Sequence, residues 1–431
     1  MSISDMFSDF LNNITVDNAD TISLRYGEIT AALNKCFRDT ESKTANSLQV
    51  GSYGRWTAIK GVSDLDMLYI IPKSKWDDYK DGKQSKLLSD ARDAIKARYP
   101  TTKVKVDQLI VKVSYNDFDV EVQPVFENDD GSYTFPYTYD NGRWKKTKPR
   151  EEIAAMKEFD EQKNRNLRRL CKMARAWKNK HGVVMGGLLI DTLAHNFLKS
   201  TSEYDNKSYA SYDELCRDFF GYLKDQPDQN HYKALGSNQN VDVKKKFQAK
   251  AKKTYTLCVK AIEAGTENKA YGRWKKAFGK NFPAAPKVAT ESLVVKAART
   301  WRNTEQFVED HHSLRIDYQL EIDCDVYRAD STRNSLRQLL ANGHGISSNK
   351  KLIFKIKSCD VPAPYEVKWK VLNQGAEARN RDCIRGDIMG SNLSNNRRKE
   401  STDFKGNHIV ECYVLLGNRV VARDEIEVPI L

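Results

Sequence analysis

Apolar positions follow a helical repeat in the first 45 residues of the chain. Side chains three or four positions apart share one face of a helix. The residues with this spacing are Ile22, Tyr26, Ile29, Leu33 and Phe37. The stripe is typical of an amphipathic helix, and we expect two helices over residues 1–45.

Between residues 48 and 127 the pattern changes to short strand-like runs. The three runs are Met67–Ile71, Val104–Val113 and Asp119–Phe126, and such runs predict strands of a partly buried sheet. A polar, helical stretch at Trp76–Arg98 separates the first two. Long helical patterns return from Glu151 onward. This order predicts an α+β fold in which a sheet is followed by a helical lobe.

Beyond Phe307 the chain again shows short alternating runs. They lie at Leu352–Lys357, Val367–Val371, His408–Leu416 and Arg419–Val428. The last two flank Gly417-Asn418, a pair that suits the positive φ angles of a two-residue hairpin loop. The pattern predicts a β-rich second domain, with a sandwich as its architecture.

A change of composition marks the boundary between the two parts. The segment Gly279–Pro286 combines two prolines with small residues, which is typical of the end of a folded unit. We predict a sheet-containing region at 1–150, a helical lobe at 151–285, a linker at 286–305 and a β-rich domain at 306–431.

Composition narrows the classes of protein to which the chain can belong. Its 431 residues suit two or three domains. The net charge of +13 lies almost wholly before Trp301, mostly in 141–180 and 241–280, and favours a polyanionic ligand for that part.

The eight cysteines are isolated, which excludes a zinc ribbon or a disulfide framework. The longest uncharged apolar stretch is too short to span a membrane, and the N-terminus is unlike a signal peptide, so we expect a soluble, cytoplasmic protein.

The segment from Gln49 to Ile70 carries the candidate chemistry. Asp64 and Asp66 are two positions apart at the start of a strand-like run, so both side chains leave the same face of the strand. Carboxylates on one face form a site for hard divalent cations. Twelve residues upstream, Gly51-Ser52 offers a flexible backbone and a hydroxyl that can hold a phosphate.

A third acid on a neighbouring strand would complete a site for two metal ions. Asp119 and Glu121 are both placed for this, and both point to the same face of their strand. In such a site one ion lowers the pKa of an attacking hydroxyl while the other neutralises a triphosphate and its leaving pyrophosphate. The third carboxylate would lie nearest the acceptor hydroxyl, which makes it our candidate general base.

These motifs resemble the signature of the polymerase-β-type nucleotidyltransferases. Gly-Ser at 51–52 followed by Asp-x-Asp at 64–66 is similar, within that superfamily, to the cGAS/DncV-like nucleotidyltransferases (CD-NTases) of bacterial CBASS antiphage systems. The resemblance implies a polymerase-β-like core and places Gln49, Gly51 and Ser52 at the donor triphosphate. Many relatives have an acid three residues before a strand proline, which favours Glu121, whereas Asp119 has the commoner residue type; both remain candidates.

A second region agrees with this resemblance. Residues 169–178 and 185–191 are similar to the helical core of the same enzymes. The match implies that Lys172 and Gly187 also hold the donor triphosphate. The chain departs from the pattern at Gly187-Leu188, where relatives often have serine, in some followed by a tyrosine that stacks on the base.

The C-terminal part resembles the adenylyl/guanylyl and SMODS C-terminal sensor domain, which accompanies some CD-NTases. The matching segments are 365–375, 385–386 and 404–413. If the domain binds a ligand, Arg385 and His408 are candidate contacts, with a structural ion pair or turn hydrogen bond as the alternative. For Trp369 a place in the core is the favoured interpretation.

Together the resemblances imply an enzyme that joins ATP, GTP or other NTPs into a cyclic oligonucleotide. Its cofactor would be two Mg²⁺ ions, with Mn²⁺ as a substitute. The product would be purine-containing, such as a cyclic trinucleotide, and would activate a separate antiphage effector. A regulatory partner protein would control the enzyme. No membrane and no obligatory DNA template are expected. The alternatives are a template-independent polymerase of RNA or linear oligonucleotides and a non-catalytic nucleotide-sensing protein.

Overall fold

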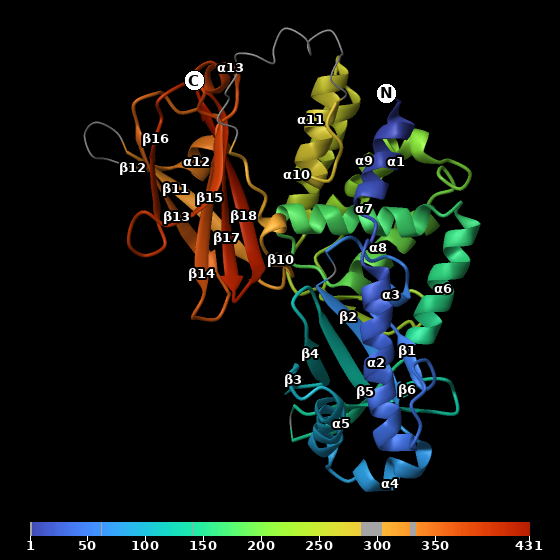
Figure 1. Cartoon of the computed structure of the whole chain (residues 1–431). Coiled ribbons are helices and arrows are strands. Elements are labelled where there is room, and N and C mark those ends of the chain that lie inside the picture. The colour runs from blue at the N-terminus through green and yellow to red at the C-terminus, as the bar shows by residue number, and fades with distance from the viewer. Residues whose placement is uncertain (1, 62, 140, 286–303, 328–332) are drawn as a thin grey trace. The chain divides into compact units, whose positions relative to one another are not determined.

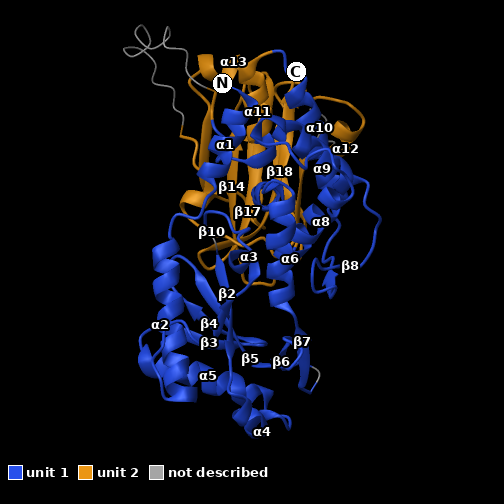
Figure 2. Ribbon diagram, turned by 90° about the vertical axis from the view of Figure 1, so that its right-hand side faces the viewer, with its two compact units in different colours: residues 1–176, 186–265, 276–283 blue, residues 177–185, 266–275, 284–431 orange. Residues whose placement is uncertain are grey.

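The computed structural model of the chain describes residues 2–61, 63–139, 141–285, 304–327 and 333–431 (Figure 1). These residues form two units (Figure 2). Unit 1 consists of residues 1–176, 186–265 and 276–283, and unit 2 of residues 177–185, 266–275 and 284–431. The predicted linker at 286–305 falls, except for its last two residues, outside the described part of the chain.

Two helices open unit 1, as the apolar stripe predicts. Helix α1 (Ile3–Asn13) begins with a capping box, in which the Ser2 hydroxyl accepts a hydrogen bond from the Asp5 amide and the Asp5 carboxylate accepts one from the Ser2 amide. Helix α2 (Ala19–Arg38) buries the predicted apolar face against the sheet.

The sheet of unit 1 has seven strands. Its main path follows the order β1 (Ser47–Gln49), β2 (Asp64–Ile70), β5 (Asp119–Glu127), β4 (Ile110–Ser114) and β3 (Lys103–Asp107), and β6 (Tyr133–Tyr137) and β7 (Arg143–Thr147) extend from β5. Strands β2 and β5 run parallel, and the other pairs run antiparallel.

One predicted strand proves to be two. The run Val104–Val113 is a hairpin of β3 and β4, turned at residues 108 and 109. Gln108 has a φ of +57°, in the left-handed region that a tight turn requires. Lysine and valine alternate before and after the turn, but residues 107–110 (Asp-Gln-Leu-Ile) interrupt the alternation, so the sequence does hold a signal for the turn.

Short helices connect the first strands of the sheet. Helix α3 (Gly51–Gly54) lies between β1 and β2, and α4 (Trp76–Tyr79) and α5 (Gln84–Arg98) occupy the predicted helical stretch. The apolar faces of α2 and α5 share one buried core with β2, β4 and β5. The acidic side chains at the start of β2 and β5 are not part of this core, and they contribute to the site described below.

The helical lobe follows the sheet, as the sequence predicts. Its helices are α6 (Pro149–Gln162), α7 (Asn166–His181), α8 (Gly187–Lys199), α9 (Tyr212–Lys224), α10 (Gln248–Ile262) and α11 (Glu267–Phe278). A small two-stranded sheet, β8 (His231–Lys233) and β9 (Asn240–Asp242), lies between α9 and α10. Phe7 and Phe10 of α1 pack against Phe278 and Phe282, so the two ends of unit 1 close one aromatic core.

Unit 2 contains the predicted sandwich. One sheet has the order β10 (Ser313–Leu314), β18 (Arg419–Ile430), β17 (Gly406–Leu416), β14 (Glu366–Leu372) and β15 (Arg385–Gly390). The other has the order β12 (Arg333–Ser335), β11 (Leu320–Tyr327), β13 (Lys351–Cys359) and β16 (Arg398–Ser401). Two short helices, α12 (Leu336–Ala341) and α13 (Ala376–Asn380), join strands. Trp369 is fully buried between the sheets, 6.4 Å from the ring of Phe354. The hairpin at Gly417-Asn418 is confirmed.

Unit 2 also includes Trp177–Met185, far earlier in the sequence than the sandwich. The Lys180 ammonium group lies 2.9 Å from a carboxylate oxygen of Glu411 and 2.7 Å from one of Glu425. Val184 belongs to a buried cluster with five residues of the later chain: Val308, Ile316, Tyr413, Leu415 and Val420. Both the charged and the apolar parts of this early segment are therefore integrated into unit 2.

The structure confirms the predicted α+β class, with its sheet, helical lobe and β-rich C-terminal part. Among the described residues, no helix is long and apolar enough to cross a bilayer.

Candidate active site

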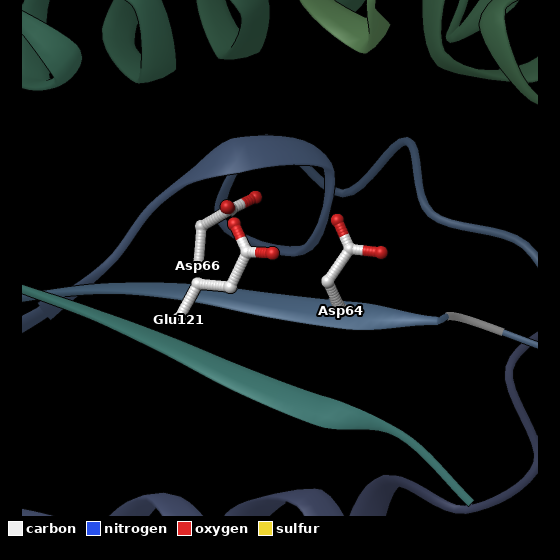
Figure 3. Close-up of side chains that lie close together, drawn as sticks. All are labelled: Asp64, Asp66 and Glu121. Atoms are coloured by element: carbon white, nitrogen blue, oxygen red, sulfur yellow. The ribbon is translucent and has the colours of Figure 1, made fainter. Parts of the chain in front are cut away.

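Three carboxylates converge at the start of the two parallel central strands. Asp64 and Asp66 extend from β2, and Glu121 extends from β5 directly opposite Asp66 in the strand register. One oxygen of each lies within 4.8 Å of the others (Figure 3). All three side chains are half-buried, so solvent and ligands reach them. Oxygen donors gathered in this way fit a hard divalent cation.

Asp119, the other candidate for the third acid, lies outside this group. Its side chain is buried, 4% exposed, and its carboxylate lies 2.8 Å from the Lys112 ammonium group on β4. A buried acid is stable as an anion when a cation pairs with it. Asp119 therefore has a structural partner of its own, and the described residues that group around a candidate metal position are Asp64, Asp66 and Glu121.

The turn that faces the acidic cluster requires glycine at position 51. Gly51 has a φ of +63°, and a Cβ atom at this position would lie 1.8 Å from an Asp66 carboxylate oxygen. Any side chain would therefore collide with a metal-ligand candidate. The Val50 amide donates a hydrogen bond to the Asp66 carbonyl at 3.1 Å, which fixes the turn against β2.

The neighbouring candidates Gln49 and Ser52 lie on the two sides of Gly51. Gln49 ends β1, where it pairs with Met67 of β2. Ser52 lies in α3, and its carbonyl accepts hydrogen bonds from the Thr57 and Ala58 amides at 2.9 and 3.1 Å. These bonds draw the chain after α3 back to the turn. The structure thus brings Gly51 and the acidic cluster together, with Ser52 next in the chain.

Lys172 lies on α7 and is half-buried among basic residues. Burial, together with the positive charge of Arg168, lowers the pKa of its ammonium group. Within the part of the chain that the structure describes, this group has no ion-pair or hydrogen-bond partner. A half-buried cation without a protein partner is suited to an anionic ligand.

Gly187 begins α8 and contacts the side chain of Arg175. Its carbonyl accepts a hydrogen bond from the Arg175 guanidinium at 3.1 Å, and a Cβ atom here would lie 3.2 Å from the same nitrogen. The small residue therefore allows close packing of α7 on α8. The contact that the structure gives Gly187 is with the Arg175 side chain.

Two family models match the chain on either side of the helical lobe. Residues 1–160 match the Second Messenger Oligonucleotide or Dinucleotide Synthetase (SMODS) domain, and residues 302–431 match the Adenylyl/Guanylyl and SMODS C-terminal sensor domain. Both are the domains that the sequence motifs indicate. The chain belongs to the CD-NTase family. The acidic cluster and the Gly51 turn lie within the first matched range.

Known proteins similar to this CD-NTase are distant in sequence. A probable cyclic nucleotide synthase of Bacillus cereus (strain VD146) is 23% identical over 186 residues, which are 40% of this chain. The chain spans about half, 54%, of that relative's length.

Two solved structures are similar to this chain at low sequence identity, and the one with the higher TM-score, CdnC, shows the same fold. CdnC of E. coli MS115-1, solved with HORMA-deltaN, has a TM-score of 0.50 at 15% identity and covers 65% of this chain and 98% of its own. DncV of Vibrio cholerae in its apo form has a TM-score of 0.46 at 15% identity and covers 55% of this chain and 69% of its own.

A buried network behind the CD-NTase turn was not predicted from the sequence. Asp191 of α8 is fully buried, and its carboxylate contacts the guanidinium groups of Arg55 and Arg175. Burial alone would raise the pKa of Asp191, but the two cations lower it to about 2. One signal in the sequence was available, because Asp191 is the single acid in the apolar segment Gly187–Ala194.

The two candidate residues of the C-terminal domain line one cavity of about 70 Å³. Arg385 makes a two-pronged ion pair with Glu400, at 2.7 and 3.2 Å. The His408 ring is buried, which lowers its pKa. Its Nδ1 accepts a hydrogen bond from the Gln374 amide at 3.2 Å, so Nε2 carries the proton and faces the Phe404 carbonyl at 3.3 Å. Both side chains thus have internal partners.

Proposed function

We propose that this CD-NTase joins nucleoside triphosphates into a cyclic oligonucleotide and releases pyrophosphate at each step. The observation that carries the proposal is the convergence of Asp64, Asp66 and Glu121 beside a turn that tolerates only glycine. A site with three clustered acids beside a glycine turn fits metal-assisted nucleotidyl transfer. The curated relative, a probable cyclic nucleotide synthase, supports the same activity.

The acidic cluster would hold two Mg²⁺ ions, which Mn²⁺ could replace. The bound ions would supply the charge that activates an acceptor hydroxyl and neutralises the leaving pyrophosphate. Asp64 and Asp66 would contribute oxygens from one strand and Glu121 from its neighbour. We assign the third position to Glu121 because Asp119 pairs with Lys112.

The protein's own groups would bind and orient the triphosphate. The turn at Gly51 and Ser52 would direct backbone amides and a hydroxyl at it, and Lys172 would neutralise its charge. Glu121, nearest the acceptor, would take the proton of the attacking hydroxyl. The oxygen would then form a bond to the α-phosphorus as the bond to the pyrophosphate oxygen breaks.

We also propose three finer features of the function, for which the family and its relatives give support. A purine-containing product, such as a cyclic trinucleotide that activates a separate effector, is the messenger suggested by the pairing with the sensor domain. The solved complex of CdnC with HORMA-deltaN supports a regulatory partner protein.

The deciding experiment is product analysis. The purified protein is incubated with Mg²⁺ or Mn²⁺ and four labelled NTPs, and the products are treated with phosphatase and identified by mass spectrometry. A phosphatase-resistant product with the mass of a cyclic di- or trinucleotide supports the proposal. A phosphatase-sensitive ladder would assign the protein to the linear polymerases instead.

Two matched variants test the third acid. Glu121→Gln should reduce turnover by several orders of magnitude, because it removes a metal ligand. Asp119→Asn should retain most turnover per folded molecule, with the folded fraction measured by circular dichroism. The reverse result would transfer the role to Asp119.

The C-terminal cavity is our candidate ligand site of the sensor domain. Support comes from Arg385 and His408, which line it together. A ligand larger than a few atoms would have to replace the ion pair of Arg385 with Glu400. Reaction products that raise the melting temperature of the wild-type protein, but not of Arg385→Ala, would support this role; equal shifts would refute it.

A further inference from the structure

The buried carboxylate of Asp191 joins chain segments that are far apart in the sequence. Its Oδ2 accepts hydrogen bonds from the Arg55 Nε at 2.8 Å, the Thr57 hydroxyl at 3.2 Å and the Arg175 Nη2 at 3.0 Å. Its Oδ1 lies 2.6 Å from the Arg175 Nη1. Hydrogen bonds to a charged, buried group are the strong ones. Arg55 and Thr57 both follow α3 directly, so this carboxylate holds the chain immediately behind the Gly51-Ser52 turn.

The same network extends to the other elements of the proposed triphosphate site. Arg175 lies on α7, one turn beyond Lys172, and donates to the Gly187 carbonyl at 3.1 Å. Arg168, one turn before Lys172, donates to the Arg55 carbonyl at 3.2 Å. The connected segments are therefore the chain after α3, both sides of Lys172 on α7, and the first turn of α8. All of them lie in unit 1.

The backbone between the two anchored residues is strained. Trp56 has a φ of +63°, and its side chain is 70% exposed. Left-handed backbone is unfavourable for a bulky side chain and persists only where the surroundings enforce it. The residues on both sides of Trp56 bond to the same Asp191 oxygen. These contacts, together with the hydrogen bonds from the Thr57 and Ala58 amides to the Ser52 carbonyl, hold Trp56 in this conformation, and such strain is typical of functional segments.

We propose that Asp191 is a positioning residue, which holds the Gly51-Ser52 turn in register with Lys172 so that both contact one triphosphate. The inference rests on the proposed function, because it assigns the turn and Lys172 to the same ligand. Asp191 itself touches no substrate. Its effect passes through Arg55 and Thr57 to the turn and through Arg175 to α7.

The mildest way to loosen this network is Thr57→Val, which removes one hydroxyl and leaves both ion pairs in place. The matched control is Thr254→Val on α10, also fully buried, whose hydroxyl donates to the Lys250 carbonyl at 3.2 Å. Thr57→Ser is the rescue variant because it keeps the hydroxyl. Asp191→Asn, with nearly the same shape but no charge, is the stronger perturbation.

Three readouts separate positioning from general stability. They are the affinity for inorganic tripolyphosphate with Mg²⁺ by calorimetry, kcat and KM for ATP, and amide hydrogen exchange of the peptide 50–58. Thr57→Val should lower tripolyphosphate affinity and kcat/KM by about 10-fold or more, in line with a lost hydrogen bond to a charged group. It should also speed exchange in the peptide 50–58. Thr57→Ser should behave like the wild type.

Equal losses in Thr57→Val and Thr254→Val, or unchanged exchange of the peptide 50–58 in both Thr57→Val and Asp191→Asn, would overturn the positioning role. Failure of the proposed function looks different: the wild type would then neither bind tripolyphosphate nor consume ATP. In that case hydrogen exchange still decides whether Asp191 orders the turn.

Discussion

The acidic cluster and Asp191 both place carboxylates in unit 1, in opposite electrostatic surroundings. Asp64, Asp66 and Glu121 bring three like charges within 4.8 Å and remain half-buried. Asp191 is fully buried, and two guanidinium groups balance its charge. The three clustered carboxylates repel one another, and a bound cation would relieve this repulsion. The charge of Asp191 is already balanced by groups of the protein. A group of like charges at a half-buried site indicates ligand binding, whereas a buried charge that protein groups neutralise indicates a structural role.

The largest effect that we predict is the loss of NTP turnover when the acidic cluster is changed. Changing Asp64 and Asp66 together to Asn should reduce NTP turnover by about 1000-fold or more, because the ligands of the catalytic ions are lost. In metal-free buffer the melting temperature should stay the same or rise, since like charges have been removed. A variant that turns over NTPs at the wild-type rate would contradict the site assignment.

Removal of Asp191 should lower the stability of the fold, in addition to its effect on the position of the turn. Asp191→Ala leaves the buried Arg175 guanidinium without this carboxylate and leaves Arg55 only its longer contact with Glu152 at 3.4 Å, a change that costs about 3–5 kcal/mol. Urea denaturation followed by circular dichroism measures this loss of unfolding free energy. A loss no larger than that of the double Asn variant would erase the distinction between the two groups of carboxylates.

Metal ions should stabilise the cluster and leave the network around Asp191 unchanged. At a concentration 100 times its dissociation constant, Mg²⁺ should add about 2.7 kcal/mol to the unfolding free energy. The double Asn variant is the control and should gain almost nothing, and Ca²⁺ or Mn²⁺ titrations would rank the fit of the site. Equal stabilisation of both proteins would place the ion elsewhere.

If Lys172 binds the triphosphate as proposed, it should give this binding a pH dependence. Its lowered pKa means that the ammonium group loses its charge at a lower pH than an ordinary lysine does. As pH rises through this pKa, affinity for tripolyphosphate should fall, whereas Lys172→Arg should keep its affinity at alkaline pH. Lys172→Met should lose about 10-fold in affinity, the scale of one charge-assisted hydrogen bond. An identical pH profile for the wild type and the Arg variant would exclude Lys172.

The smallest effect concerns the strain at Trp56. Glycine usually destabilises a position relative to alanine, but at a φ of +63° the order should reverse. We expect Trp56→Gly to be more stable than Trp56→Ala by about 1 kcal/mol. Thermal denaturation of the two variants measures this difference. If the alanine variant is the more stable, the prediction is wrong, and the backbone at position 56 leaves the left-handed region once the indole is removed.

Local patterns predicted the fold class and the acids of β2, because both depend on neighbours in the chain. The alternation of β2 places Asp64 and Asp66 on one face, and the structure adds that the parallel register sets Glu121 opposite Asp66. The choice between Asp119 and Glu121 could not be made from the sequence, since it depends on the position of Lys112 on a third strand.

The buried contacts of Asp191 behind the Gly51-Ser52 turn could not be predicted from the sequence, for a related reason. Arg55 and Asp191 are 136 positions apart, and their contact depends on how α8 packs behind α3. No periodicity reports such a pair. The hairpin at residues 108 and 109 was not predicted because lysine and valine alternate on both sides of it, although residues 107–110 interrupt that alternation.

The discontinuity of unit 2 has a consequence for the synthesis of the chain. Trp177–Met185 leaves the ribosome long before the strands that complete its surroundings. Until β17 and β18 have been made, Lys180 lacks Glu411 and Glu425, and Val184 lacks its apolar neighbours. During translation this segment therefore lacks these native partners until β17 and β18 have been made, and those two strands complete the surroundings of Lys180 and Val184.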